Sequence, residues 1–177
     1  GDVYKRQDFR GKQAVFSYLI APMVLPHIVL GMALFRIGLF LDTSEGFALN
    51  ATDSLWFYVV AHTTITIPYA IITIGASLQT LDRNLEEAAQ ILGASYFKTI
   101  FFITIPLIKS GLIGAFIFSF IISFDEFIVT YFLATFNQTL PIQIYSTLMF
   151  QLEPSIASIS TLMLALTALL TLSLIHI

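Results

Sequence analysis

Four long apolar runs constrain this chain more than any other feature, because each is close to the length of a helix that crosses a bilayer. A spanning helix needs roughly 20 apolar residues. Only 11% of the 177 residues are charged, against about 25% in soluble domains. Run length favours helices over strands, so the sequence predicts an all-α membrane protein, a polytopic helical bundle with about four transmembrane helices. The runs are Val15 to Leu41, Leu55 to Leu78, Leu107 to Leu133 and Ser155 to Leu170.

Prolines indicate where these helices should bend. Pro22 and Pro26 interrupt the first run, and proline removes a backbone donor and clashes with the preceding turn. The first span is therefore expected mainly from Pro26 to Leu41. Pro68 predicts a bend in the second span, and residues 134–153 are expected to form an external loop.

Charge in the loops predicts the orientation. The segment after the first run holds acidic residues without lysine or arginine, whereas Arg83, Lys98 and Lys109 lie between the second and third runs. Basic residues are enriched in cytoplasmic loops, so this second segment is expected to face the cytoplasm. Arg36, near the outer end of its span, is expected to reach toward lipid headgroups or to meet Asp42.

The cytoplasmic segment has the pattern of two short helices joined at a glycine. One apolar stripe recurs at helical spacing, and polar residues occupy the other sides. Asp82 can cap the first helix, Gly93 permits the positive φ that ends it, and Ser95 can cap a second helix running toward Phe102. A partner's groove could close over this bend. The stripe consists of Leu81, Leu85, Ala88 and Leu92.

This segment resembles the EAA coupling motif of the membrane permeases of ATP-binding cassette (ABC) importers. The matching residues are Glu87-Ala88-Ala89, then Gly93, Ile103 and Ile105-Pro106, with isoleucine at 105 where the family usually has leucine. Other segments are similar to the spermidine/putrescine permease branch, and the similarity covers almost all of residues 8–171. These segments are Pro26 to Gly31, Leu81 to Arg83, Ser123 to Phe127, Thr139 to Pro141 and Ile144 to Ser146.

The resemblance implies a type I permease fold in the bacterial inner membrane, crossing it several times. It implies two permease subunits lining a path, ABC ATPase subunits bound on the cytoplasmic side, and an extracytoplasmic solute-binding protein. The chain itself carries no phosphate-binding loop of the G-x-x-x-x-G-K-[ST] type, so no enzyme activity, catalytic residue, cofactor or nucleic-acid partner is expected. The residues expected to couple to the ATPase are Glu86, Glu87, Ala88, Ala89, Leu92, Gly93 and Pro106.

Two carboxylates in the third run are candidates for the substrate path. Asp125 and Glu126 lie deep in a span or at its outer end, and ionisable groups inside a membrane usually face a cavity. At least one could offset the charge of a polyamine; the alternative is that both are hydrated at the interface. His27 and His62 lack the neighbouring ligands of a zinc site, so no metal is expected.

A strip of small residues precedes these carboxylates in the third run. Gly111, Ala115, Ser119 and Ser123 recur every four residues, and small side chains let helix backbones approach closely. The strip is expected to pack against another span or the partner permease.

The sequence is also compatible with other transport functions. Importers of iron, sulfate or phosphonate share the architecture, so polyamine uptake rests on similarity alone. A secondary transporter that uses Asp125 and Glu126 as cation or proton sites is a further alternative, although it leaves the EAA segment unexplained. The cytoplasmic helix could also be an amphipathic segment lying on lipid.

The two ends of the sequence have an unusual relation. GAT GTG TAT AAG AGA CAG encodes residues 2–7, and its reverse complement encodes residues 172–177, as in a transposase adapter translated at both ends. Residues 1–7 and 172–177 are therefore interpreted as sequencing-adapter artefacts. Residues 8–171 are interpreted as a fragment of a permease transmembrane domain, expected to hold the last four of six spans.

Overall fold

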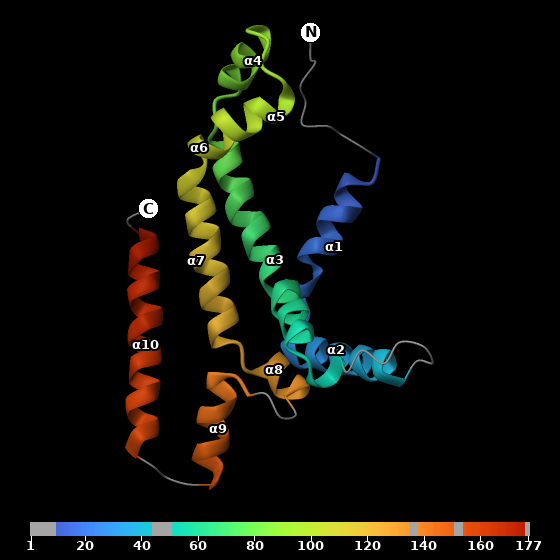
Figure 1. Cartoon of the computed structure of the whole chain (residues 1–177), viewed down its shortest axis with the longest axis vertical. Coiled ribbons are helices and arrows are strands. Elements are labelled where there is room, and N and C mark those ends of the chain that lie inside the picture. Colours follow the sequence, from blue (N-terminus) through green and yellow to red (C-terminus); the bar gives the residue numbers. More distant parts are fainter. Residues whose placement is uncertain (1–9, 44–50, 135–137, 151–153, 176–177) are drawn as a thin grey trace. The chain divides into compact units, whose positions relative to one another are not determined.

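Helices make up nearly all of the chain that can be described (Figure 1). The computed structural model describes residues 10–43, 51–134, 138–150 and 154–175, and within these ranges there is no strand. The predicted all-α class is confirmed. The chain divides into two units, Gly1–Pro68 with Phe127–Thr139 and Tyr69–Glu126 with Leu140–Ile177.

The first unit is built on the packing of α2 against α8. It contains α1 (Lys12–Val24), α2 (His27–Thr43), the 3₁₀ turn η1 (Ala51–Asp53), the first part of α3 (Leu55–Gln79) and α8 (Ile128–Leu133). Val129 and Thr130 of α8 are fully buried. The Tyr58 hydroxyl of α3 donates to the Leu133 carbonyl at 3.0 Å, and His62 Nε2 lies 2.9 Å from Thr130 Oγ1.

Asp42 joins the end of α2 to η1. Its carboxylate accepts hydrogen bonds from the backbone N–H groups of Ala51 and Thr52 and from the Thr52 hydroxyl, the last at 2.6 Å. Asp42 therefore bonds to η1 and not to Arg36, which was one of the two expectations for Arg36. The Arg36 side chain is exposed.

The second unit holds the segment expected to face the cytoplasm and two long apolar helices. After the second part of α3 come α4 (Arg83–Ile91), α5 (Tyr96–Thr99), the π-helix η2 (Ile100–Thr104), α6 (Ile105–Leu107), α7 (Lys109–Asp125), α9 (Leu140–Phe150) and α10 (Pro154–Ile175). In this unit α10 packs along α7, and α9 contacts α10. Figure 1 shows α4 and α5 beyond the last turn of α3.

The small-residue strip of α7 lies partly against α3, as expected for a close helix contact. A Cβ built on Gly111 would lie 1.8 Å from Ser77 Oγ, so the two backbones approach more closely there than any side chain at position 111 allows. Ala115 is buried, and the Ser119 hydroxyl is buried without a hydrogen-bond partner. The strip is thus covered within the chain for at least its first two turns.

Helix length bounds the number of spans. Among the described residues, α3 and α10 are long and apolar enough to cross a membrane. Two bent pairs raise this number to four if each pair counts as one span: α1 with α2, bent by 108°, and Tyr96–Leu107 with α7, bent by 71°. The predicted four spans therefore hold only with bent helices. In the first run the break falls at the prolines, and α2 (His27–Thr43) closely matches the helix expected mainly from Pro26 to Leu41.

One sequence prediction on helix boundaries is wrong. The third run is not one helix, because Glu126 adopts an extended backbone after α7 and α8 begins only at Ile128. The expected external loop contains α9, whose Pro141 lies in the first turn where proline is tolerated. At 1.5 Å per residue α9 is about 17 Å long, too short to cross the hydrocarbon layer of about 30 Å.

Candidate coupling site

The beginning of α4 is fixed by an aspartate, as predicted. Asp82 has an extended backbone, with φ −71° and ψ 113°. Its carboxylate accepts a hydrogen bond from the Asn84 backbone N–H at 3.0 Å. One of the N–H groups that a helix leaves unpaired at its start is thereby satisfied.

The end of α4 requires glycine for its backbone conformation. Gly93 has a φ of +90°, and nothing lies within 4 Å of a Cβ built there. The Ala94 N–H donates to the Ala89 carbonyl and the Gly93 N–H to the Gln90 carbonyl, both at 3.0 Å. This pair of bonds is the Schellman motif. Gly93 is therefore needed for its positive φ and not for lack of space.

The second helix starts where the sequence predicts and then changes type. The Ser95 hydroxyl accepts from the Lys98 N–H at 3.4 Å and caps α5. The chain continues as η2, in which the Ile105 N–H donates to the Ile100 carbonyl five residues earlier. Pro106 follows in the first turn of α6. The bent helical pair is confirmed, and the π-helix at its end was not predicted.

The faces of α4 are reversed relative to an ordinary surface helix. Glu86, Ala89 and Gln90 are half-buried toward the rest of the unit. The apolar stripe points outward instead: Leu85 is 46% exposed, Leu92 is 87% exposed, and Ala88 and Glu87 are also exposed. A helix in a soluble unit normally buries its apolar face.

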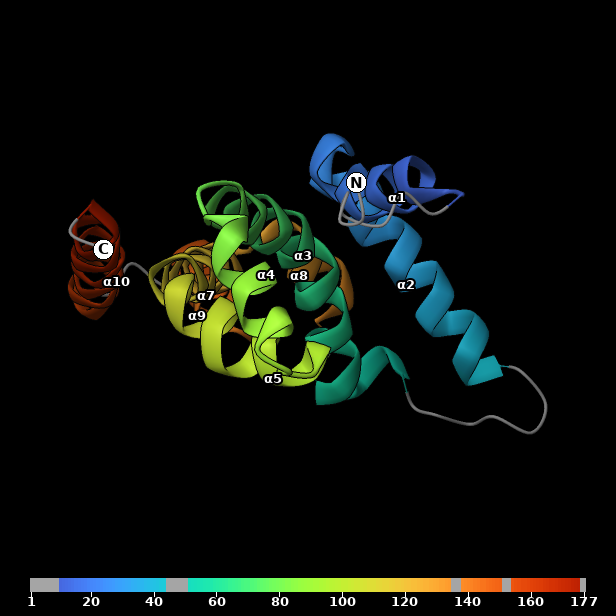
Figure 2. The ribbon, with the colours of Figure 1, turned by 90° about the horizontal axis from the view of Figure 1, so that it is seen from above.

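Exposed apolar side chains on both sides of Gly93 give the bend an apolar surface. We call it the bend surface; it is formed by Leu85, Ile91, Leu92 and Phe97 around Gly93. Ile91 is 85% and Phe97 is 72% exposed. Figure 2 shows the bend surface's two helices, α4 and α5, from above. Exposed apolar side chains gathered around one turn are typical of interaction surfaces, which makes the bend surface a candidate.

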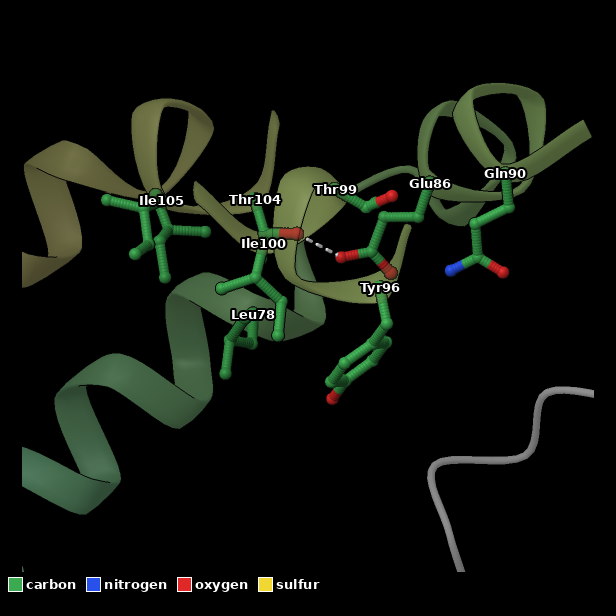
Figure 3. A pocket seen from close by; sticks show the side chains of 9 residues that line it. Leu78, Glu86, Gln90, Tyr96, Thr99, Ile100, Thr104 and Ile105 are labelled. Atoms are coloured by element: carbon green, nitrogen blue, oxygen red, sulfur yellow. Dashed lines mark hydrogen bonds between the residues drawn. The ribbon is translucent and has the colours of Figure 1, made fainter. Parts of the chain in front are cut away.

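A pocket of about 340 Å³ lies under α4. The Thr104 hydroxyl donates to a Glu86 carboxylate oxygen at 2.5 Å across 18 residues of sequence, and Figure 3 shows this bond with Gln90 and Tyr96 nearby. The sequence placed Glu86 among the residues expected to couple to the ATPase, but it did not identify Thr104 as its partner. The pocket is lined by Leu78, Glu86, Gln90, Tyr96, Thr99, Ile100, Thr104, Ile105 and Ile108.

The two candidate path carboxylates lie at the other end of α7 and differ in their surroundings. Asp125 is the last residue of α7 and is exposed; its carboxylate accepts from the Thr167 hydroxyl of α10 at 3.5 Å. Glu126 is only 5% exposed. Neither belongs to the bend surface. Within the described ranges, no three His, Asp or Glu side chains are placed to hold a metal ion together.

These features define a class: a helical protein with helices long enough to cross a membrane and a bent amphipathic helix pair whose apolar side is exposed. Residues 4–177 match the family described as "Binding-protein-dependent transport system inner membrane component". The chain belongs to this family of inner-membrane transport components. The resemblance to importer permeases seen in the motif residues is thereby confirmed.

Individual relatives support the same assignment. The chain is 31% identical over 157 residues to "Putrescine transport system permease protein PotI" of Escherichia coli, covering 88% of this chain and 55% of the relative. It is 33% identical over 170 residues to "Spermidine/putrescine transport system permease protein PotC" of Haemophilus influenzae, covering 95% and 63%. A "Probable molybdenum ABC transporter permease protein" of Haloferax volcanii is 32% identical over 140 residues, covering 79% and 52%. The chain thus spans between about half and two thirds of the length of these relatives.

Proposed function

We propose that this chain forms part of the permease subunit of an ABC importer and that the bend surface docks into a cytoplasmic ATPase subunit. The observation that carries the proposal is the reversed packing of α4, which contacts its own unit through Glu86 and Gln90 and leaves Leu85 and Leu92 outside. An apolar helix face of this kind fits into a partner's groove. ATP hydrolysis would then take place in the partner.

A lipid surface is the alternative cover for the same face, and charge argues against it. Interfacial helices carry lysine and arginine on their polar side, which anionic headgroups attract. In α4 the charged residues are Arg83, Glu86 and Glu87, which give the helix a net negative charge. A protein groove that presents basic groups to Glu87 is the better match.

The remaining partners follow from the family. Its description as binding-protein-dependent supports an extracytoplasmic solute-binding protein that delivers the substrate. Importers of this kind pair two permease subunits, so a second permease is expected to complete the path and to bury apolar faces that this chain leaves exposed.

For the substrate we propose a polyamine. The relatives PotI and PotC are named for putrescine and for spermidine/putrescine, and the buried carboxylate of Glu126 suits a cation near the path. The relative named for molybdenum keeps oxyanions as an alternative class, beside iron, sulfate and phosphonate. A proton- or cation-coupled transporter would need no ATPase and would leave the bend surface without a function, so this alternative is disfavoured.

The test is ATP-dependent uptake by the full-length protein in vesicles, with its genomic ATPase, second permease and binding protein. Leu92→Ser removes an 87% exposed side chain of the bend surface, and Asn84→Ser, exposed on the same helix, is the matched control. Leu92→Ser should lower ATPase retention and putrescine uptake about tenfold, as for loss of a well-packed interface anchor, while Asn84→Ser leaves both unchanged. Equal retention in the two variants, or uptake that a protonophore alone abolishes, would refute the proposal.

A further inference from the structure

The covalent connection from α4 to the membrane helices runs through a turn that is open around its glycine. Gly93 has a φ of +90° and no atom within 4 Å of a Cβ position. At Gly93 the turn is held by the backbone bonds to Ala89 and Gln90, with no side chain packed against the Cβ position. Movement of α4 reaches α7 more directly if a second contact, besides this turn, joins α4 to the segment that leads into α7.

Thr104 supplies such a connection, because it bonds in two directions. Its hydroxyl donates to Glu86 in α4 (Figure 3). Its carbonyl accepts from the Ile108 N–H at 3.1 Å, and the Ile108 carbonyl accepts from the Leu112 N–H at 3.0 Å in α7. Three consecutive hydrogen bonds thus lead from the middle of α4 to the first turn of α7.

Thr104 lies at a buried position where the helix type changes. Thr104 is 7% exposed and is the last residue of η2, a helix type that appears mostly as single turns at functional sites. Beside the bond lies the pocket of about 340 Å³. Both Glu86 and Thr104 line this pocket, and their bond is a direct side-chain link between α4 and η2.

We propose that Glu86 and Thr104 form a tie that transmits movement of α4 to α7, which makes Thr104 a positioning residue for coupling. The inference rests on the proposed function, since the movement is driven by an ATPase subunit at the bend surface. Thr104 does not belong to that surface. Breaking the tie should leave docking in place and uncouple hydrolysis from transport.

The first test compares Thr104→Val, which keeps the side-chain shape without the hydroxyl, with Thr104→Ser, which keeps the hydroxyl. In the reconstituted transporter we expect both variants to retain the ATPase subunit. The number of substrate molecules imported per ATP hydrolysed should fall about tenfold in Thr104→Val and should recover in Thr104→Ser. A tenfold change corresponds to the loss of one hydrogen bond to a charged group. Equal transport per ATP in the two variants overturns the inference.

The second test needs no ATPase and uses amide hydrogen exchange in the full-length permease in nanodiscs. Amides of residues 86–91 should exchange about tenfold faster in Thr104→Val than in Thr104→Ser. Equal exchange would show that the tie does not hold α4, and faster exchange with unchanged transport per ATP would show that it transmits nothing. Failure of the wild-type protein to retain any ATPase refutes the proposed function instead, and the exchange comparison still decides whether the tie exists.

Discussion

Replacing Gly111 by alanine tests the closest helix contact in the second unit. The added Cβ would lie 1.8 Å from Ser77 Oγ and 2.4 Å from Ser77 Cβ. The hydroxyl can rotate away, but the Cβ of Ser77 is fixed to the α3 backbone, so the two helices must separate. Overpacking of this kind costs about 1–3 kcal/mol.

The effect can be measured as a change in thermal stability. Taking about 2 kcal/mol for Gly111→Ala and roughly 2–4 °C per kcal/mol for a chain of this size, the midpoint of unfolding in detergent should fall by about 4–8 °C. Gly114→Ala is the matched control one turn along α7, where the nearest atom within residues 8–171 is Thr73 Cγ2 at 3.9 Å. It should be neutral or slightly stabilising, because alanine has the higher helix propensity.

The double variant Gly111→Ala with Ser77→Gly separates steric conflict from other causes. Removing the Ser77 side chain removes both short contacts, so most of the lost stability should return. If Gly111→Ala unfolds at the same temperature as Gly114→Ala, or if Ser77→Gly does not rescue it, the close approach of α3 and α7 at this point is wrong.

Three further substitutions test the bend, the candidate path and the first unit. Gly93→Ala should destabilise α4 by about 1–2 kcal/mol, because residue 93 has a positive φ, and amide exchange in α4 should become faster. Gly75→Ala is the control: its Cβ position is also open but its backbone is helical, so exchange in α4 should not change. Glu126→Gln should lower substrate uptake more than Asp125→Asn, since only Glu126 is buried; equal and normal uptake would remove both from the path. Tyr58→Phe loses a hydrogen bond to a carbonyl at the end of α8 and should cost about 1 kcal/mol in thermal unfolding, and an unchanged midpoint would contradict that contact.

Short-range signals in the sequence were sufficient to predict the bend between α4 and α5. Asp82, Gly93 and Ser95 act on backbone groups within a few residues, so their roles can be predicted without knowing the fold. Hydropathy likewise identified the apolar helices, since bilayer-spanning length is a property of each segment alone.

Features that depend on contacts distant in sequence could not be predicted. The bond between Glu86 and Thr104 and the approach of Gly111 to Ser77 join different helices, and no local pattern specifies such pairs. The break after Asp125 was missed because the run stays apolar across it. The outward direction of the α4 stripe also required the structure, since periodicity defines a face and not what covers it.

Photocrosslinking from position 92 tests the central claim, docking of the bend surface on an ATPase, most directly. Leu92 is 87% exposed, so a benzophenone amino acid there should not disturb the chain itself. In membranes that hold the assembled transporter, we predict an adduct with the ATPase polypeptide whose yield changes when ATP is bound. Adducts with lipid alone, at a yield that nucleotide does not alter, would contradict the account.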